Sequence, residues 1–209
     1  LRSEQGLLPL ASQILVATDI FAALEYLATL PMTHRDIKPA NILIVVNRDR
    51  RLLKVVLADF GEAKLLSRTM TMQTVAGTPV YMAPEMREEE EGKGPKVDVF
   101  SAGVVLAEIG SGRAPNPTPE MRSEERAGQR VRVGVPEEER RAADISAIRH
   151  SEIKQLVQFC IVDDFRVRAS AKLMHQRCQT LLANTRESPR ITIFIDHVIA
   201  GRRISMEVT

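Results

Sequence analysis

The sequence predicts an α+β fold that is mostly α-helical and carries one small β-hairpin. Three observations support this prediction. Apolar residues recur at helical spacing from Ala11 to Leu30, the stretch from Val97 to Ile109 is apolar almost all round, and two short β-branched runs flank a polar turn. With 209 residues, 44% of them hydrophobic, the chain is long enough to bury a sizeable core.

The first predicted helix spans Ala11 to Leu30 and ends at Pro31, because proline lacks the backbone N–H that a continuing helix requires. Its period is set by Ile14, Leu15, Ile20, Phe21, Leu24, Leu27 and Leu30. Val97 to Ile109 has no polar face, which is typical of a central buried helix. The other predicted helices are a weak one around Glu120 to Arg130 and two stronger ones, Ile148 to Cys160 and Ala169 to Ala183.

The predicted hairpin joins Ile42–Val46 to Lys54–Leu57 across the turn NRDRR. Ser67 to Thr78 is threonine-rich and has no apolar period, so it is predicted to form an ordered or switchable loop. The segment RITIFIDHVIAGRRISMEV alternates as a strand does and follows the last predicted helix. We therefore predict one domain over residues 1–183 and a C-terminal tail of unknown role over residues 184–209.

Composition and patterning argue against several function classes. The net charge is +2 and the basic residues are spread along the chain, so no nucleic-acid partner is expected. We expect no signal peptide and no membrane span, because Asp19 and Glu25 interrupt the apolar stretch from Leu7 to Met32. Cys160 and Cys178 lack the paired spacing of a metal site, and a reducing, cytoplasmic or nuclear location is expected.

Residues suited to catalysis gather in HRDIKPANIL, which begins at His34. Asp36 can accept a proton from an attacking hydroxyl, and Lys38 can neutralise negative charge on a transferring group. Asn41 offers an oxygen to a hard cation such as Mg²⁺. Asp59 follows the second strand of the predicted hairpin, so its carboxylate is expected to lie close to Asn41. A proton acceptor beside a two-ligand magnesium site is suited to phosphoryl transfer.

The motifs HRDIKPAN, ADFG, GTPVYMAPE and DVFSAGVVL occur in the order and spacing of the C-terminal lobe of a eukaryotic protein kinase. The chain resembles this family, in its serine/threonine form, from about Gly6 to Ala183. Four such motifs in succession make a chance match negligible. The resemblance implies a kinase-like C-lobe over residues 1–183, ATP and Mg²⁺ as cofactors, and a protein substrate whose Ser or Thr hydroxyl receives the γ-phosphate.

The resemblance also implies roles in catalysis for individual residues. Asp36 matches the catalytic base, and Lys38 matches the lysine that contacts the γ-phosphate. Asn41 and Asp59 match the Mg²⁺ ligands of the family, and with Lys38 they would bind the nucleotide phosphates. Thr78 resembles the threonine that bridges the catalytic acid and the lysine.

Other matched positions have structural or binding roles in the family. His34 and Phe60 resemble members of a hydrophobic stack that links the two lobes, and Leu43 stands where the family packs against adenine. Gly61 lets the backbone turn sharply after Phe60. Asp98 resembles the acid at a helix start that holds the catalytic loop from beneath.

Two further pairs follow from the resemblance. Glu85 resembles the acid of a buried ion pair, for which Arg168 in DDFRVRAS is the natural partner. Arg35 resembles the arginine that pairs with a phosphate on the activation segment. Thr74, three residues before Gly77, is the candidate phosphosite, although a Thr-rich loop that is merely polar explains the same pattern.

The 209 residues contain no Gly-rich loop and strand lysine of the kind that the N-terminal kinase lobe carries, and they start at Leu1. We expect a partial domain whose N-lobe comes from an upstream segment or from another chain. The preferred interpretation is a piece of an active kinase, because the catalytic-loop and DFG residues are intact. The alternatives are a catalytically inactive C-lobe that serves as a docking or regulatory module, and a C-lobe completed by a second polypeptide.

Overall fold

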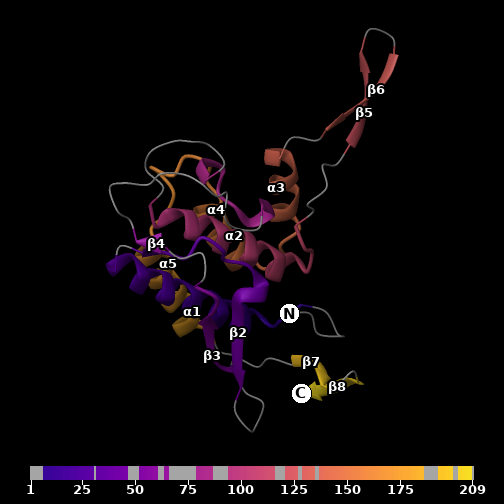
Figure 1. Cartoon of the computed structure of the whole chain (residues 1–209). Helices are drawn as coiled ribbons and strands as arrows, with labels where there is room; N and C mark the ends of the chain where they lie inside the picture. The colour runs from indigo at the N-terminus through magenta and orange to yellow at the C-terminus, as the bar shows by residue number, and fades with distance from the viewer. Residues whose placement is uncertain are drawn as a thin grey trace.

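The computed structural model describes residues 7–30, 32–46, 52–60, 64–65, 79–86, 94–115, 121–126, 129–134, 137–185, 193–199 and 202–208. Helices form the body of the molecule, and short antiparallel strand pairs are attached to it (Figure 1). The helices are α1 (Leu10–Thr29), α2 (Lys96–Ser111), α3 (Glu137–Ser146), α4 (Ser151–Cys160) and α5 (Ala171–Asn184). This arrangement confirms the predicted α+β class, with the protein's core among the helices.

Helix α1 packs against α5, α2 and the strand β3 (Leu52–Leu57), so it touches most of the body. It ends where the sequence predicted, with the N–H of Leu30 donating to the carbonyl of Leu27, just before Pro31. By length and composition alone α1 could cross a membrane, but 61% of its apolar window is buried inside the protein, as in the core helix of a soluble protein.

Helix α2 is buried on nearly every side, as its sequence without a polar face predicted. It packs against α1 and α4. Its contact with α4 is close at Gly103, where a Cβ atom would collide with the Cβ of Cys160. The helix ends at Gly112, whose φ of 70° is a left-handed conformation that glycine adopts without strain, and whose N–H closes the last turn on Glu108.

Helices α4 and α5 complete the core and carry the two cysteines. Cys160 and Cys178 are free thiols, and both are fully buried. Burial raises the pKa of Cys178 to about 12 and raises the pKa of Cys160 well above its ordinary value. Both side chains therefore stay protonated at neutral pH and act as small apolar groups.

Two strand pairs frame the polar loops of the central motifs. β2 (Ile42–Val46) pairs with β3 in the predicted hairpin, with Ile42 opposite Leu57, and β3 begins two residues earlier than predicted. β1 (Met32–Thr33) pairs with β4 (Lys64–Leu65). Alternate residues of β2 and β3 face the core, since Ile42, Val55 and Leu57 are buried.

The prediction of a weak helix around Glu120 to Arg130 is wrong. This region forms a hairpin of β5 (Met121–Arg126) and β6 (Gln129–Gly134). Glu and Arg favour helix locally, which explains the error. The available signals for a strand pair were a glycine, Gly128, near the middle of the region and the alternation of Val131 and Val133 with arginine. Figure 1 shows this hairpin extending away from the helical body.

Helix α3 follows this hairpin and was not predicted, because its sequence EEERRAADIS is mostly polar and contains few apolar residues. The strand-like alternation after α5 corresponds to a further hairpin, β7 (Ile193–Ile199) with β8 (Arg202–Val208).

Candidate active site

The motifs HRDIKPAN and ADFG each connect the β1–β4 strand pair with the β2–β3 strand pair. The segment from His34 to Asn41 leaves β1 and enters β2, while the segment that starts at Ala58 leaves β3 on the way to β4. At the shared end of the β2–β3 hairpin, the N–H of Ala58 donates to the carbonyl of Asn41 at 2.9 Å. Asn41 and Asp59 therefore flank the same hairpin end, as the sequence predicted.

The catalytic-loop carboxylate, Asp36, is held by two side chains of its own loop. The ammonium of Lys38 lies 2.6 Å from Asp36 Oδ2, and the amide nitrogen of Asn41 donates to the same oxygen at 2.9 Å. Asn41 also donates to the backbone carbonyl of Asp36 at 2.8 Å. The Asp36 side chain is largely buried, so its position is set by the protein.

The orientation of the Asn41 amide suits a cation. Its nitrogen donates to two oxygens of Asp36, so the amide oxygen is the atom that Asn41 can present to a metal ion. Asp59 supplies a carboxylate at the adjoining end of β3. These two oxygen donors match the chemistry of Mg²⁺, which in nucleotide sites takes few protein ligands and completes its shell with phosphates and water. The residues present therefore fit the implied ion.

Asp98 at the start of α2 supports the catalytic loop from below. Its two carboxylate oxygens accept hydrogen bonds from the backbone N–H groups of His34 (2.7 Å) and Arg35 (2.8 Å). Burial raises the pKa of the Asp98 carboxyl, and these N–H donors act in the opposite direction. The contact anchors the loop to the central helix, at the position where the sequence placed a supporting acid.

Two residues beside the site have left-handed backbone conformations that only glycine adopts freely. Arg35 has a φ of 69° and Asp59 a φ of 61°. Each costs on the order of 1 kcal/mol, and such residues cluster at functional sites. The Arg35 side chain is steadied by a 3.2 Å hydrogen bond from Nε to Thr33 Oγ1.

The rings of His34 and Phe60 lie against each other, with centroids 4.8 Å apart. His34 is fully buried and its Nε2 contacts the carbonyl of Ala58 at 3.1 Å. Phe60 and Leu43 are 47% and 52% exposed, so apolar surface is open on this side of the site.

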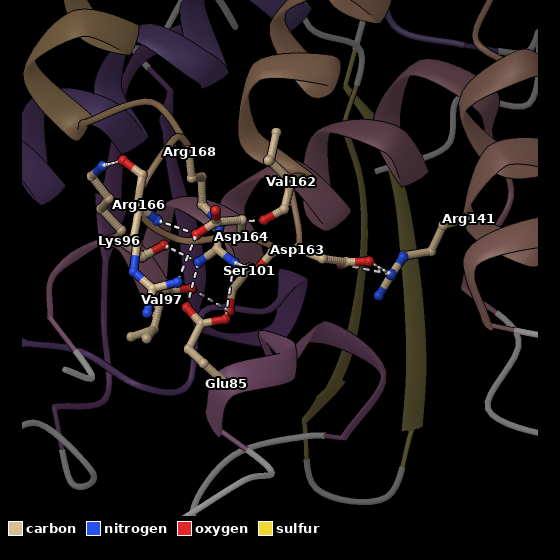
Figure 2. Close-up of polar contacts among 10 residues, drawn as sticks. All are labelled: Glu85, Lys96, Val97, Ser101, Arg141, Val162, Asp163, Asp164, Arg166 and Arg168. Carbon is tan, nitrogen blue, oxygen red and sulfur yellow. Dashed lines mark hydrogen bonds and ion pairs between the residues drawn. The ribbon is translucent and has the colours of Figure 1, made fainter. Parts of the chain in front are cut away.

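Glu85 and Arg168 form a buried, bidentate ion pair, with Nη1–Oε1 and Nη2–Oε2 distances of 2.5 and 2.9 Å (Figure 2). The guanidinium of Arg168 also donates hydrogen bonds to the backbone carbonyls of Val162, Lys96 and Asp163. Its guanidinium also lies 4.9 Å from the centre of the Phe100 ring. The structure thus brings together the two residues that the sequence paired, 83 positions apart.

Some residues near the site were not singled out from the sequence. Asp19 on α1 accepts a hydrogen bond from the backbone of Val55, and Tyr81 donates to Glu108 at 2.8 Å. The available signal for Asp19 was a charge inside an otherwise apolar helical run, which requires a partner. Gly61, Thr74 and Thr78, to which the sequence assigned roles, lie outside the described residues.

A family model described as the protein kinase domain matches residues 2–179. The chain is 34% identical over 169 residues to the serine/threonine-protein kinase dst1 of Dictyostelium discoideum, covering 79% of this chain and 21% of that protein. It is 43% identical over 95 residues to the ovarian-specific serine/threonine-protein kinase Lok of Drosophila melanogaster, and 41% identical over 108 residues to the serine/threonine-protein kinase DCLK3 of Mus musculus.

These last two matches cover 44% and 52% of this chain, and 20% and 13% of the relatives. The chain therefore spans about a fifth or less of the length of these curated relatives. The family match, by contrast, extends over most of the chain and includes the catalytic loop, the DFG segment and the Glu85–Arg168 pair. This chain belongs to the protein kinase family, and its relatives are of the serine/threonine type.

Proposed function

We propose that this chain is the C-terminal lobe of a serine/threonine protein kinase that transfers the γ-phosphoryl group of ATP to Ser or Thr hydroxyls of proteins. The observation that carries the proposal is the arrangement of Asp36, with Lys38 and Asn41 bonded to one of its oxygens, beside the hairpin end where Asp59 follows β3. A positioned proton acceptor, a cation and two oxygen donors are the components that phosphoryl transfer requires.

In the proposed reaction, Asp36 takes the proton of the substrate hydroxyl as that oxygen forms its bond to the γ-phosphorus. The bond from the γ-phosphorus to the bridging oxygen breaks, and ADP leaves with the electron pair. Lys38 has three N–H donors, so it can keep its contact with Asp36 and also bind a γ-phosphate oxygen. Asn41 and Asp59 would hold Mg²⁺, which when bound neutralises charge on the phosphates.

The remaining assignments belong to the same proposal. Leu43, exposed on the outer side of β2, contacts adenine, and Thr78 bridges Asp36 and Lys38. Arg35 binds a phosphate placed on Thr74. The open apolar surface at Leu43 and Phe60 supports the proposal that an N-terminal lobe, from an upstream segment or another chain, covers this side.

The test is phosphate transfer from radiolabelled ATP to a generic basic protein in the presence of Mg²⁺, by the chain alone and with any upstream coding segment restored. Asp36→Asn should lower kcat by about 10²- to 10⁴-fold while nucleotide binding persists, because only the proton acceptor is lost. Asp59→Ala should weaken Mg²⁺ binding and abolish transfer. Asp163→Asn, at an exposed carboxylate outside the site, serves as the control.

Restored protein that binds no Mg²⁺–ATP would overturn the catalytic proposal. The C-lobe would then be assigned to the alternative function, a docking or regulatory module without catalysis.

A further inference from the structure

Helix α1 packs against β3 of the hairpin that carries the metal-binding residues, and a charged side chain of this helix bonds to the strand. Asp19 Oδ2 accepts a hydrogen bond from the backbone N–H of Val55 on β3 at a distance of 2.7 Å. The Asp19 side chain is partly buried, and Val55 is only 4% exposed. The donor therefore lies where water is largely shut out, and the carboxylate takes the place of a solvent partner.

The register of the hairpin explains why this N–H needs a partner outside the sheet. Because the N–H of Ala58 bonds across to Asn41, alternate pairs along the ladder exchange hydrogen bonds, and the pair Ile44–Val55 falls between them. The N–H of Val55 thus points away from β2, toward the open edge of β3. At this edge α1 packs against the strand, and Asp19 is placed to accept the bond.

Strand β3 connects Val55 to the proposed metal-binding residues. The strand ends at Leu57, and the next two residues are Ala58, bonded to Asn41, and Asp59. Any displacement of β3 at Val55 therefore moves the strand end from which Asp59 leaves, and strains the bond that holds Asn41 beside it.

We propose that Asp19 is a positioning residue: its bond to Val55 fixes the β2–β3 hairpin against α1 and so sets where Asn41 and Asp59 lie. Its importance for catalysis rests on the proposed function, whereas its effect on the hairpin does not. Such support from outside the ligand set is a general way in which proteins tune a metal site.

The same helix offers a matched control. Glu25, also on α1 and also partly buried, directs its carboxylate to His175 Nδ1 on α5 at 2.7 Å. Replacing Glu25 by alanine removes a carboxylate contact of similar length between α1 and α5, and α5 carries no residue of the candidate site. Glu25→Ala therefore measures the effect of a weaker attachment of α1 to α5. Asp19→Ala measures the effect of a weaker attachment of α1 to the β2–β3 hairpin.

The experiment compares backbone amide hydrogen exchange by NMR in the 209-residue chain and in Asp19→Ala, Asp19→Asn and Glu25→Ala. In Asp19→Ala, exchange at Val55 and at Ala58 should rise at least tenfold, while core amides of α2 keep their protection. Asp19→Asn, which retains an acceptor oxygen, should restore most of the protection. Glu25→Ala should leave both amides as in the parent chain.

Added Mn²⁺, a paramagnetic stand-in for Mg²⁺, gives the second measurement through line broadening at Asn41 and Asp59. Asp19→Ala should weaken this binding about tenfold relative to Glu25→Ala. Unchanged protection of Ala58 in a folded Asp19→Ala protein would overturn the proposal. Absence of Mn²⁺ broadening in the parent chain would instead count against the metal site of the proposed function, and the exchange result would still decide the role of Asp19.

Discussion

At the scale of single residues, Arg168 joins several separate segments of the chain. It pairs with Glu85 at the end of the motif GTPVYMAPE, bonds the carbonyl of Lys96 at the start of α2, and lies over the ring of Phe100. Arg141 of α3 approaches Phe100 as well, at 5.5 Å, and binds Asp163 bidentately. The buried guanidinium of Arg168 thus joins three parts of the chain. Its N–H donors bond to the Glu85 carboxylate and to backbone carbonyls.

Removing one partner of this pair is predicted to destabilise the protein strongly. Glu85→Ala leaves a buried guanidinium without its carboxylate, which should lower the free energy of unfolding by about 3–5 kcal/mol. Urea denaturation followed by circular dichroism measures the change. Asp163→Asn weakens the exposed Arg141 pair and should cost at most about 1 kcal/mol. Equal losses in the two variants would contradict the prediction.

How far single residues could be predicted depends on whether a motif marks them. The pairing of Glu85 with Arg168 and the placement of Asp98 beneath His34 came from motifs in the sequence. Asp19 did not, because its partner is a backbone N–H 36 positions away, and a backbone group leaves no trace in the sequence. The outward direction of that N–H depends on strand register, which only the folded hairpin defines.

At the scale of secondary-structure elements, α2 and α4 pack closely against each other at Gly103. A Cβ there would collide with the Cβ of Cys160 and touch Ile161. Gly103→Ala is therefore predicted to destabilise the protein by about 1–3 kcal/mol, even though alanine is the better helix former.

The matched double variant isolates this contact. Cys160→Gly removes the opposing Cβ, so the effect of Gly103→Ala should become smaller, or reverse, in the Cys160→Gly background. Thermal denaturation of the four proteins in this cycle gives the coupling energy. Additive effects would show that the two helices do not meet as described.

Long apolar helices could be predicted from the sequence, whereas polar elements could not. α1, α4 and α5 each bury an apolar face that leaves a periodic pattern, and α2 is apolar almost all round. The sequences of the β5–β6 hairpin and α3 are mostly polar, so local propensity dominated the prediction and favoured helix for β5. Pairing between strands is a non-local interaction that a single window of sequence does not contain.

At the scale of the whole molecule, the described contacts of the body lie within residues 7–185. The β7–β8 hairpin of the tail pairs with itself, and no extended contact joins it to a described helix. A chain truncated after Thr185 is predicted to keep its melting temperature within about 2 °C, which corresponds to about 0.5 kcal/mol for a protein of this size.

Differential scanning calorimetry checks the prediction. Truncation after Cys178 provides the contrast, since it removes Leu181 and Leu182, which pack against the core, and should lower the melting temperature clearly. A loss of more than about 5 °C on the first truncation would place the domain boundary beyond residue 183.

The all-round burial of α2 has a consequence for how the protein is made. One side of the helix packs on α1, which is synthesised first, but another packs on α4, which ends at Cys160. On a ribosome that adds 5–20 residues per second, about 3 to 13 s separate the synthesis of Lys96 from that of Cys160. During this interval the side of α2 that will pack against α4 has no partner. This apolar side can therefore bind a chaperone that recognises chains still being translated.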